Sequence, residues 1–358
     1  MKYNFAIHQF TRVFVYGDGI TKGVLLTQKI LSELGFESKI YMLSDNVDIR
    51  LKADVYHIDE YVENSNNVLL FHAAIGDTEQ ERIFNFLDRK ILVYHNITPS
   101  HFFDGKAYKE RCDLGRMQFE KNKDCFFGAY ADSDYNANEL KSFGYKDVEV
   151  LPILVDLKPR IESSNNKNVI LEKYKDSFNI LFVGRVIQNK CQHELINVMY
   201  ELKSRQITNI KLFIVGGNHY SEYFQFLFRY RDSLGLNENV IITDKVTDDD
   251  LAAYYKVSNL YLSLSEHEGF GMPLLEAILN NMPVLAYDTS AISSTIGSRG
   301  LLSYKSTDYV VENILKIKDD LSYREEVMSY QKKHLKGFEY NTIKEKFFNY
   351  LKDVCSIS

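Results

Sequence analysis

Several kinds of residue are scarce in this chain. Its 358 residues include no tryptophan, 5 prolines and 4 cysteines. No apolar run approaches the roughly 18 residues that cross a bilayer, and the N-terminal residues lack the apolar core of a signal peptide. The cysteines form no Cys-x-x-Cys pair, which argues against a zinc site or a disulfide framework and predicts reduced thiols in a cytoplasm. They are Cys112, Cys125, Cys191 and Cys355.

An excess of positive charge is also missing. The chain carries 43 basic and 49 acidic residues, a formal net charge of −6. Residues 1–156 hold 18 basic and 24 acidic side chains, whereas residues 157–358 hold 25 of each. A duplex-binding domain needs a net basic surface, so we expect no nucleic-acid partner. The composition, 45% hydrophobic and 26% charged, is otherwise that of a globular protein, and the length predicts two domains.

Short apolar runs alternate with amphipathic stretches, which is typical of parallel sheets with helices on both faces. The polar stretch Asp156–Ser177 interrupts this alternation and is interpreted as a linker, with a short helix at Val169–Tyr174. We therefore predict an α/β protein of two doubly wound domains, with ligands at the carboxyl ends of the strands. In the first half we expect strands at Phe5–His8, Val13–Tyr16, Ser38–Met42, Val68–His72, Ile91–His95, Phe126–Ala131 and Val148–Leu151, and helices that include Gly23–Leu34 and Glu79–Leu87. In the second half we expect strands at Asn179–Val183, Lys211–Val215, Val240–Thr243, Leu260–Ser263 and Pro283–Tyr287, and helices at Glu194–Lys203, Tyr220–Leu234, Asp248–Val257, Pro273–Asn280 and Ile343–Val354.

The most informative segment is SLSEHEGFGMPLLEAILNNMPVLAYD, residues 263–288. A strand leads through a glycine-bearing loop into a helix, and Pro273 suits the first turn of that helix. Such a helix N-terminus presents free backbone N–H groups to an anion. Glu268 in the loop and Glu276 in the helix are placed to bond sugar or ribose hydroxyls beside a bound phosphate.

Two cations follow an earlier strand, in the segment LFVGRVIQNK. Arg185 and Lys190 lie at the carboxyl end of that strand, where a forked guanidinium and a compact ammonium suit a pyrophosphate. Gly184 precedes them, and Gly216–Gly217 ends the next strand. Glycine at these turns lets the backbone approach a ligand.

At these residues the chain resembles glycosyltransferase family 4, the retaining glycosyltransferases that use nucleotide sugars and have the GT-B fold. The family signature is a glutamate, seven residues and a second glutamate, which here is Glu268 to Glu276 in EGFGMPLLE. The family's phosphate-binding arginine and lysine match Arg185 and Lys190 in VGRVIQNK. The segments at 92–103 and 131–140 are similar to bacterial members that build lipopolysaccharide O-antigen or other surface polysaccharides.

The resemblance implies two Rossmann-like domains that face each other across a cleft. Residues 1–156 would be the acceptor domain, completed by a C-terminal helix at 338–358, and residues 157–337 the donor domain. The chain would transfer a hexose from a nucleotide diphosphate sugar, with GDP-mannose favoured over UDP- or dTDP-sugars, to a growing surface glycan. The acceptor would be a glycan or a lipid-linked glycan, and no metal or other cofactor would be required.

The resemblance also assigns roles to single residues. Arg185 and Lys190 would stabilise the charge on the leaving diphosphate, Glu268 would bind the hexose hydroxyls, and His95 would be a catalytic histidine at the end of its strand. Glu276 would bind the ribose, and Val246 would contact the base, although the family often has glycine where Lys245 stands. The other expected donor-binding residues are Gly17, Asp18, Gly19, Gly184, Gly216, His267, Gly269, Phe270, Gly271 and Met272.

Plainer interpretations remain open for several of these residues. The two glutamates also fit a solvated loop acid and a partner of the helix dipole. His95 and His72, which end apolar strands, also fit core histidines, and Asp18 also fits a helix cap. The run Gly17–Gly23 is similar to a dinucleotide-binding loop, but a glycine motif alone is weak. Asp132-Ser133-Asp134 has the form of a metal-binding Asp-x-Asp motif; we interpret it instead as the cap of a helix at Asn136–Phe143.

Other functions of the same fold are alternatives to glycosyl transfer. They are a sugar-nucleotide epimerase, a phosphorylase, for which no pyridoxal-phosphate site is evident, and a non-catalytic nucleotide-binding subunit. A dehydrogenase is a more distant alternative. The basic and aromatic stretch Tyr108–Lys123 fits peripheral contact with the cytoplasmic face of an inner membrane, and equally a solvated helix face.

Overall fold

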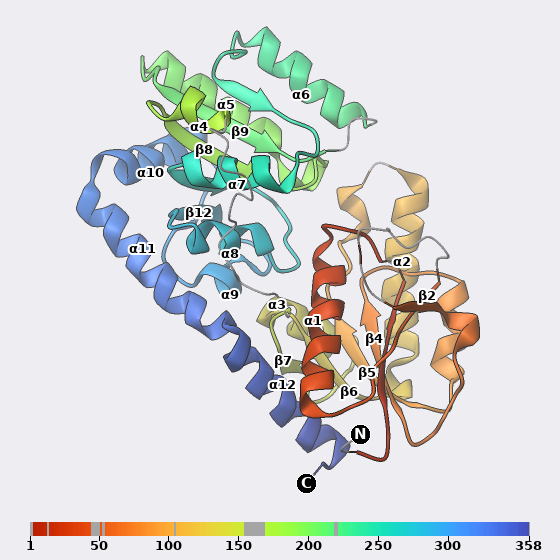
Figure 1. The fold of residues 1–358 in the computed structure, drawn as a ribbon. Helices are drawn as coiled ribbons and strands as arrows, with labels where there is room; N and C mark the ends of the chain where they lie inside the picture. The colour runs from red at the N-terminus through yellow and green to blue at the C-terminus, as the bar shows by residue number, and fades with distance from the viewer. Residues whose placement is uncertain are drawn as a thin grey trace. The chain divides into compact units, whose positions relative to one another are not determined.

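The computed structural model describes residues 3–12, 14–43, 51, 54–103, 105–153, 169–217 and 221–357. The chain divides into two compact units (Figure 1). The first contains residues 1–156 together with residues 337–358, and the second contains residues 157–336. Most of the stretch interpreted as a linker, residues 156–168, lies outside the described residues. Among the described helices, none is both long enough and apolar enough to cross a membrane.

The first unit is built on a seven-stranded parallel sheet with the order β3-β2-β1-β4-β5-β6-β7. All five residues of β1 and all six of β4 are buried, as expected of parallel strands covered on both faces. The strand order reverses between β1 and β4, which creates a crevice at their carboxyl ends. The strands are β1 (Ile7–Thr11), β2 (Ile40–Met42), β3 (Val55–His57), β4 (Val68–Ala73), β5 (Arg89–Tyr94), β6 (Phe126–Ala131) and β7 (Glu149–Val150).

Among the described residues, four α-helices cover this sheet, and one of them, α12, follows the second unit in the sequence. α12 lies beside α1 (Figure 1), and Glu33 of α1 accepts hydrogen bonds from Tyr340 and Lys344 of α12. Phe347 and Leu351 of α12 belong to the same buried apolar cluster as Ile30 of α1. The helices are α1 (Gly19–Leu34), α2 (Lys106–Lys121), α3 (Asp134–Ser142) and α12 (Tyr340–Cys355).

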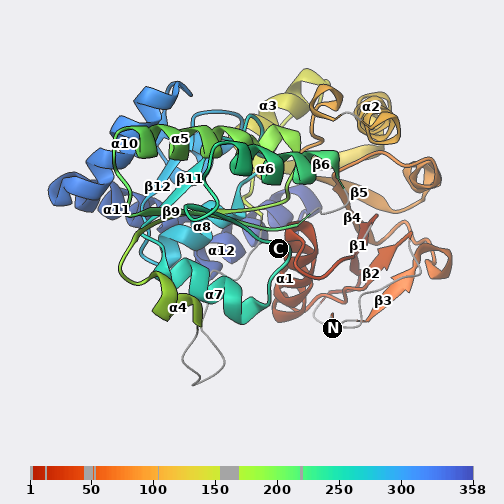
Figure 2. The same cartoon turned by 90° about the horizontal axis from the view of Figure 1, so that it is seen from above.

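The second unit repeats this plan with a six-stranded parallel sheet of order β10-β9-β8-β11-β12-β13. Its strand order reverses between β8 and β11. Figure 2 shows α5 and α6 on one side of this sheet and α4 and α7 on the other. The strands are β8 (Phe178–Val183), β9 (Ile210–Val215), β10 (Val240–Ile242), β11 (Leu260–Ser263), β12 (Val284–Tyr287) and β13 (Leu301–Leu302). The helices are α4 (Val169–Tyr174), α5 (Gln192–Ser204), α6 (Glu222–Ser233), α7 (Asp248–Val257), α8 (Met272–Leu279), α9 (Ile292–Ile296), α10 (Thr307–Asp319) and α11 (Leu321–Leu335).

The structure corrects several of the predicted elements. The strand predicted at Val13–Tyr16 is absent at 14–16, and Val13 lies outside the described residues; the apolar first strand instead extends to Thr11. The helix predicted at Gly23–Leu34 begins four residues earlier, at Gly19. The stretch Glu79–Leu87 forms a 3₁₀ helix, η2 (Glu79–Asn85), instead of an α-helix.

Candidate functional site

The predicted site residues of the second unit gather at the point where its strand order reverses. Arg185 and Lys190 follow β8, and Glu268 follows β11, the neighbouring strand. The backbone N–H of Glu266 donates to the carbonyl of Asn189 at 2.8 Å, which joins the loops after these two strands. Crevices of this kind are the usual ligand sites of open α/β sheets.

Lys190 and Glu268 are bonded to each other. The Lys190 Nζ atom lies 2.7 Å from Glu268 Oε1 and donates to the carbonyl of His267 at 2.9 Å. The exposed fractions of the two side chains are only 14% and 16%, so water screens the pair weakly. An ammonium group has three N–H donors, and these two contacts leave one for a ligand. Sequence reasoning placed both residues at the site but did not foresee this pair.

Arg185 differs from Lys190 because its guanidinium has no partner among the residues that the structure describes. The side chain is exposed, and among the described residues it makes no hydrogen bond or ion pair; only its carbonyl is used, as the acceptor for Gln192. The adjoining Gly184 carbonyl leaves no room for a side chain at Gly216, where an added Cβ would lie 2.1 Å from that oxygen. Gly216 therefore packs against the Gly184 backbone, and Arg185 extends into solvent beside it.

The loop after β11 is fixed from both sides before it enters α8. His267 and Phe270 are buried, and the Phe270 carbonyl accepts a hydrogen bond from Thr295. Gly271 has a φ of 91°, a left-handed value that favours glycine, and caps α8. The prediction that Pro273 lies in the first turn of this helix is confirmed.

Glu276 faces the helix that follows β10. Its Oε2 atom accepts a hydrogen bond from the hydroxyl of Tyr255, on α7, at 2.9 Å. Tyr255 is fully buried, so this bond fixes one oxygen of the carboxylate against the body of the unit. Val246, the predicted base contact, lies half-buried in the loop between β10 and α7.

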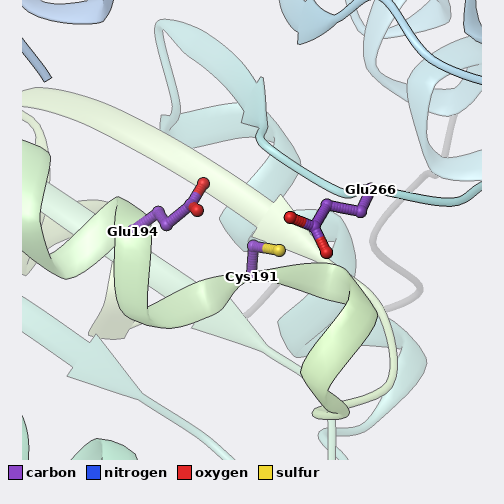
Figure 3. Close-up of side chains that lie close together, drawn as sticks. All are labelled: Cys191, Glu194 and Glu266. Carbon is purple, nitrogen blue, oxygen red and sulfur yellow. The ribbon is translucent and has the colours of Figure 1, made fainter. Parts of the chain in front are cut away.

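Three other side chains lie close together beside the site, as Figure 3 shows. Ligand atoms of Cys191, Glu194 and Glu266 lie within 4.8 Å of one another. An ammonium group already lies among them: the Lys305 Nζ is 2.9 Å from Glu194, 3.0 Å from Glu266 and 3.6 Å from the Cys191 sulfur. Burial disfavours charge on Lys305, but its hydrogen bonds to the two carboxylates outweigh burial and raise its pKa. Burial raises the pKa of Cys191 to about 11, so the thiol is protonated at neutral pH.

This lysine cluster joins three segments around the site. Glu194 lies in the first turn of α5, Glu266 in the loop after β11, and Lys305 in the loop after β13. Nothing in the local sequence around Lys305 signals a contact with residues 39 and 111 positions away, and sequence reasoning did not identify it.

The predicted histidine of the first unit belongs to a buried chain of four side chains. His95, directly after β5, has its Nδ1 2.8 Å from Asp132 Oδ2 and its Nε2 2.8 Å from His72 Nδ1. The His72 Nε2 lies 3.0 Å from Gln9 Oε1. Both ring nitrogens of His95 are thus bonded within the protein, which fits the core interpretation and leaves its catalytic role a prediction.

Both of the helix caps that the sequence suggested are present. Asp18 caps α1, because its Oδ2 accepts from the N–H groups of Ile20 and Thr21 at 3.0 and 3.2 Å. The cap predicted at Asp132-Ser133-Asp134 is present, and its central serine supplies it. Ser133 caps α3 by accepting from the Asn136 N–H at 3.2 Å, whereas Asp132 turns to His95.

The glycine-rich loop is shorter than predicted. Gly17 is exposed with a φ of 83°, but Gly19 is already the first residue of α1. Asp18 and its two glycines therefore form a turn and a helix start. Their predicted part in donor binding remains a prediction.

The comparisons with known proteins concern mainly the second unit. Residues 163–334 match the family model described as Glycosyl transferases group 1. The match covers nearly the whole second unit, and we refer to the matched region as the group 1 domain. Both glutamates of the predicted signature, and both cations after β8, lie inside this domain.

A curated relative of the domain is named capsular polysaccharide biosynthesis glycosyltransferase CapM, from Staphylococcus aureus. It is 30% identical over 179 residues, which are 47% of this chain and 44% of CapM. The chain thus spans about half, or less, of the length of CapM and other curated relatives.

Solved structures cover the whole chain and show its fold. A glycosyltransferase from Rickettsia africae has a TM-score of 0.78 at 15% identity, over 99% of this chain and 100% of its own. The Anabaena protein HepE, solved in complex with UDP-glucose, has a TM-score of 0.75 at 14% identity, over 98% of this chain and 100% of its own. The group 1 domain and the first unit together therefore have the GT-B fold expected from the sequence, with two Rossmann-like units.

Proposed function

We propose that this chain is a glycosyltransferase that moves a hexose from a nucleotide diphosphate sugar to a growing cell-surface glycan. The observation that carries the proposal is the pair of cations after β8. Arg185 has no protein partner among the described residues, and Lys190 keeps one N–H group available, both at the switch point of the group 1 domain. Two fixed cations at that point suit a diphosphate.

The same cations supply the catalysis in this proposal. Negative charge grows on the diphosphate as the bond to the hexose breaks, and donors fixed in advance stabilise that charge without further reorganisation. Arg185 binds the diphosphate as a fork, and Lys190 holds Glu268 with one bond and the diphosphate with another. No metal is required for this arrangement.

The carboxylates hold the rest of the donor. Glu276, fixed by Tyr255, bonds the ribose hydroxyls with its second oxygen, and Glu268, fixed by Lys190, bonds the hexose hydroxyls. We propose transfer with retention, by attack on the face that the diphosphate leaves, with the departing phosphate taking the proton of the acceptor. Isolation of a covalent glycosyl-enzyme at Glu268 would overturn this step.

The donor and the acceptor follow from the resemblance and from the relatives. GDP-mannose is the favoured donor, and the UDP-glucose bound by HepE makes UDP-glucose its main competitor. The name of CapM supports a capsular or O-antigen type of glycan as the acceptor. We place the reaction at the cytoplasmic face of the inner membrane, where a lipid-linked glycan would be presented.

Thermal unfolding in the presence of GDP, UDP, dTDP, CMP or NAD tests the donor site. A ligand at about 100 times its dissociation constant adds about 2.7 kcal/mol to the unfolding free energy. We expect one nucleoside diphosphate to stabilise the protein, with or without EDTA. Arg185→Met should abolish the effect, whereas Arg229→Met should not, because Arg229 is likewise exposed without a described partner but lies on α6.

The other outcomes separate the alternatives. Stabilisation that EDTA removes would contradict the metal-free site, and stabilisation by NAD alone would favour a dehydrogenase. A nucleoside diphosphate that binds without hexose transfer to any acceptor would indicate a non-catalytic subunit. Donor turnover that needs no acceptor would indicate an epimerase.

A further inference from the structure

The side chains of Gln9, His72, His95 and Asp132 form a buried chain of hydrogen bonds, and their contacts determine which atoms carry the hydrogens. Each link is a hydrogen bond of 2.8–3.0 Å, so one atom of each link must carry the hydrogen. Gln9 lies on β1, His72 on β4, and His95 and Asp132 directly after β5 and β6. The chain therefore runs across the strands near the carboxyl edge of the first sheet.

The Gln9 amide determines which atoms of this buried chain donate hydrogen bonds and which accept them. The Gln9 Nε2 atom donates to the carbonyl of Val24 at 3.1 Å, and a carbonyl can only accept. The other end of the amide, Oε1, is therefore the atom that faces His72 Nε2. Because this oxygen can only accept as well, the hydrogen of that bond must lie on His72 Nε2.

A neutral His72 carries one ring hydrogen, so with that hydrogen on Nε2 its Nδ1 can only accept a hydrogen bond. Burial, with a smaller contribution from the His95 ring, holds the pKa of His72 well below its usual value, which agrees with a neutral ring. The two imidazole centres lie 5.1 Å apart with planes only 7° from parallel, so the bond between the rings lies in the plane of the nitrogen lone pairs. His95 Nε2 must then be the donor to His72 Nδ1.

We propose that Gln9 and His72 are positioning residues that keep a hydrogen on Nε2 of His95. Its Nδ1 also shares a hydrogen with Asp132, so the His95–Asp132 pair holds one proton more than a neutral imidazole and an ionised carboxylate. This proton lies between His95 Nδ1 and Asp132 Oδ2, and either position leaves the hydrogen on Nε2 of His95.

A small cavity adjoins the His95–Asp132 pair, and its lining residues include no lysine, arginine or further acid. The titratable side chains of the lining are His72, His95, Tyr130 and Asp132, and burial raises the pKa of Tyr130 well above its usual value. Asp132 Oδ1 is buried and has no hydrogen-bond partner among the described residues.

Both ring nitrogens of a histidine held in this way are engaged, so it has no free lone pair with which to accept a proton. In the proposed transfer, His95 would therefore not be the base that activates the acceptor. This consequence rests on the proposed function. The protonation of the chain itself does not rest on it.

Nitrogen-15 NMR of histidine-labelled protein tests the proposal directly. Long-range ¹H–¹⁵N correlations report which ring nitrogens carry hydrogen, and His72→Gln and His95→Gln assign the signals. At neutral pH we expect hydrogen on Nε2 alone for His72 and on Nε2, with or without Nδ1, for His95. Hydrogen on Nδ1 of His72, or on Nδ1 alone of His95, would overturn the proposal.

Two substitutions of Gln9 separate positioning from simple packing. Gln9→Met removes the acceptor, so we expect the His72 hydrogen to move to Nδ1 and His95 to become a neutral ring with hydrogen on Nδ1 alone. Gln9→Glu keeps an acceptor and should keep the wild-type pattern. An unchanged pattern in folded Gln9→Met would overturn the role of Gln9. If that variant does not fold, the wild-type spectrum still decides the protonation of the chain.

His57 provides an internal control in the same spectra. Its Nδ1 accepts from the Asp59 N–H at 3.2 Å and its Nε2 lies 3.1 Å from the Leu43 carbonyl, so it also carries hydrogen on Nε2. Its signals should not respond to Gln9→Met. The nucleotide panel tests the second unit and NMR tests the first, so either proposal can fail while the other stands.

Discussion

His72 couples the stability of the first unit to pH. Because its pKa is lowered in the folded protein, the unfolded chain binds a proton at this residue below about pH 6.5 that the folded chain does not bind. The contribution of His72 to the free energy of unfolding therefore falls as the pH falls below that value, by at most about 1.4 kcal/mol per pH unit. This loss of stability stops at the lower pH at which His72 also becomes protonated in the folded protein.

Removal of this histidine should flatten the pH dependence. Between pH 7.5 and pH 5.5, we expect His72→Gln to lose about 1 kcal/mol less unfolding free energy than the wild type, as measured by urea unfolding. Equal slopes for His72→Gln and the wild type would contradict the prediction.

At the site, the sequence predicts the types of the functional residues but not their bonding partners. The residue types at the site followed from motif chemistry, as for Arg185 and the Glu268–Glu276 spacing. Their partners did not, because Lys190 meets Glu268 only when the loops after β8 and β11 come together in the folded unit. The contacts of Gln9 could not be predicted either, because its buried amide lies on β1, whose sequence has the pattern of an ordinary apolar strand.

At the scale of elements, Asp18 decides where α1 begins. Its carboxylate accepts from two N–H groups of the first turn, which would otherwise lack partners. Asp18→Ala should therefore cost about 1 kcal/mol of unfolding free energy, measured by urea or thermal unfolding.

Asp18→Asn is the matched control for the cap. Asparagine caps as well as aspartate, so its cost should be only a few tenths of a kcal/mol, from the lost interaction of the charge with the helix dipole. If both variants lose the same stability, the cap is not what stabilises this helix start.

The elements also show which patterns are informative. The bounds of β6, β11, α4 and α7 agree with their predictions, because each is a compact apolar or amphipathic run next to clear polar residues. The start of α1 was misplaced because its glycines indicated a loop, and the cap at Asp18 overrode them. β3, α10 and α11 were not predicted at all. β3 is three residues long and only half-buried, which leaves too short a pattern to identify.

At the scale of the whole molecule, the two units have separate apolar cores. A large apolar cluster of the second unit consists of residues between 178 and 327 and includes none from α12. The cores of the first unit do include α12, which contributes Ile343, Phe347, Tyr350 and Leu351 to the cluster around Ile7 and Val68. The last residues of the chain therefore stabilise its first unit, across the full length of the sequence.

Phe347 makes this dependence testable. The side chain is 1% exposed and packs against Tyr130 of β6, with ring centres 6.0 Å apart. Phe347→Ala should cost about 3–5 kcal/mol of unfolding free energy. Hydrogen exchange should show the loss in β1, β4, β5 and β6, whereas the amides of β8, β9 and β11 should keep their protection.

The neighbouring Phe348 is the matched control, because it is the same residue on the same helix and only half-buried. Phe348→Ala removes the same atoms but leaves a smaller cavity, so its cost should be well below that of Phe347→Ala. Equal loss of protection in both sheets after Phe347→Ala would mean that the two units unfold as one. Loss confined to the first sheet would mean that the second unit can stay folded while the first unit opens. In that case the nucleotide panel should still give its stabilisation in Phe347→Ala.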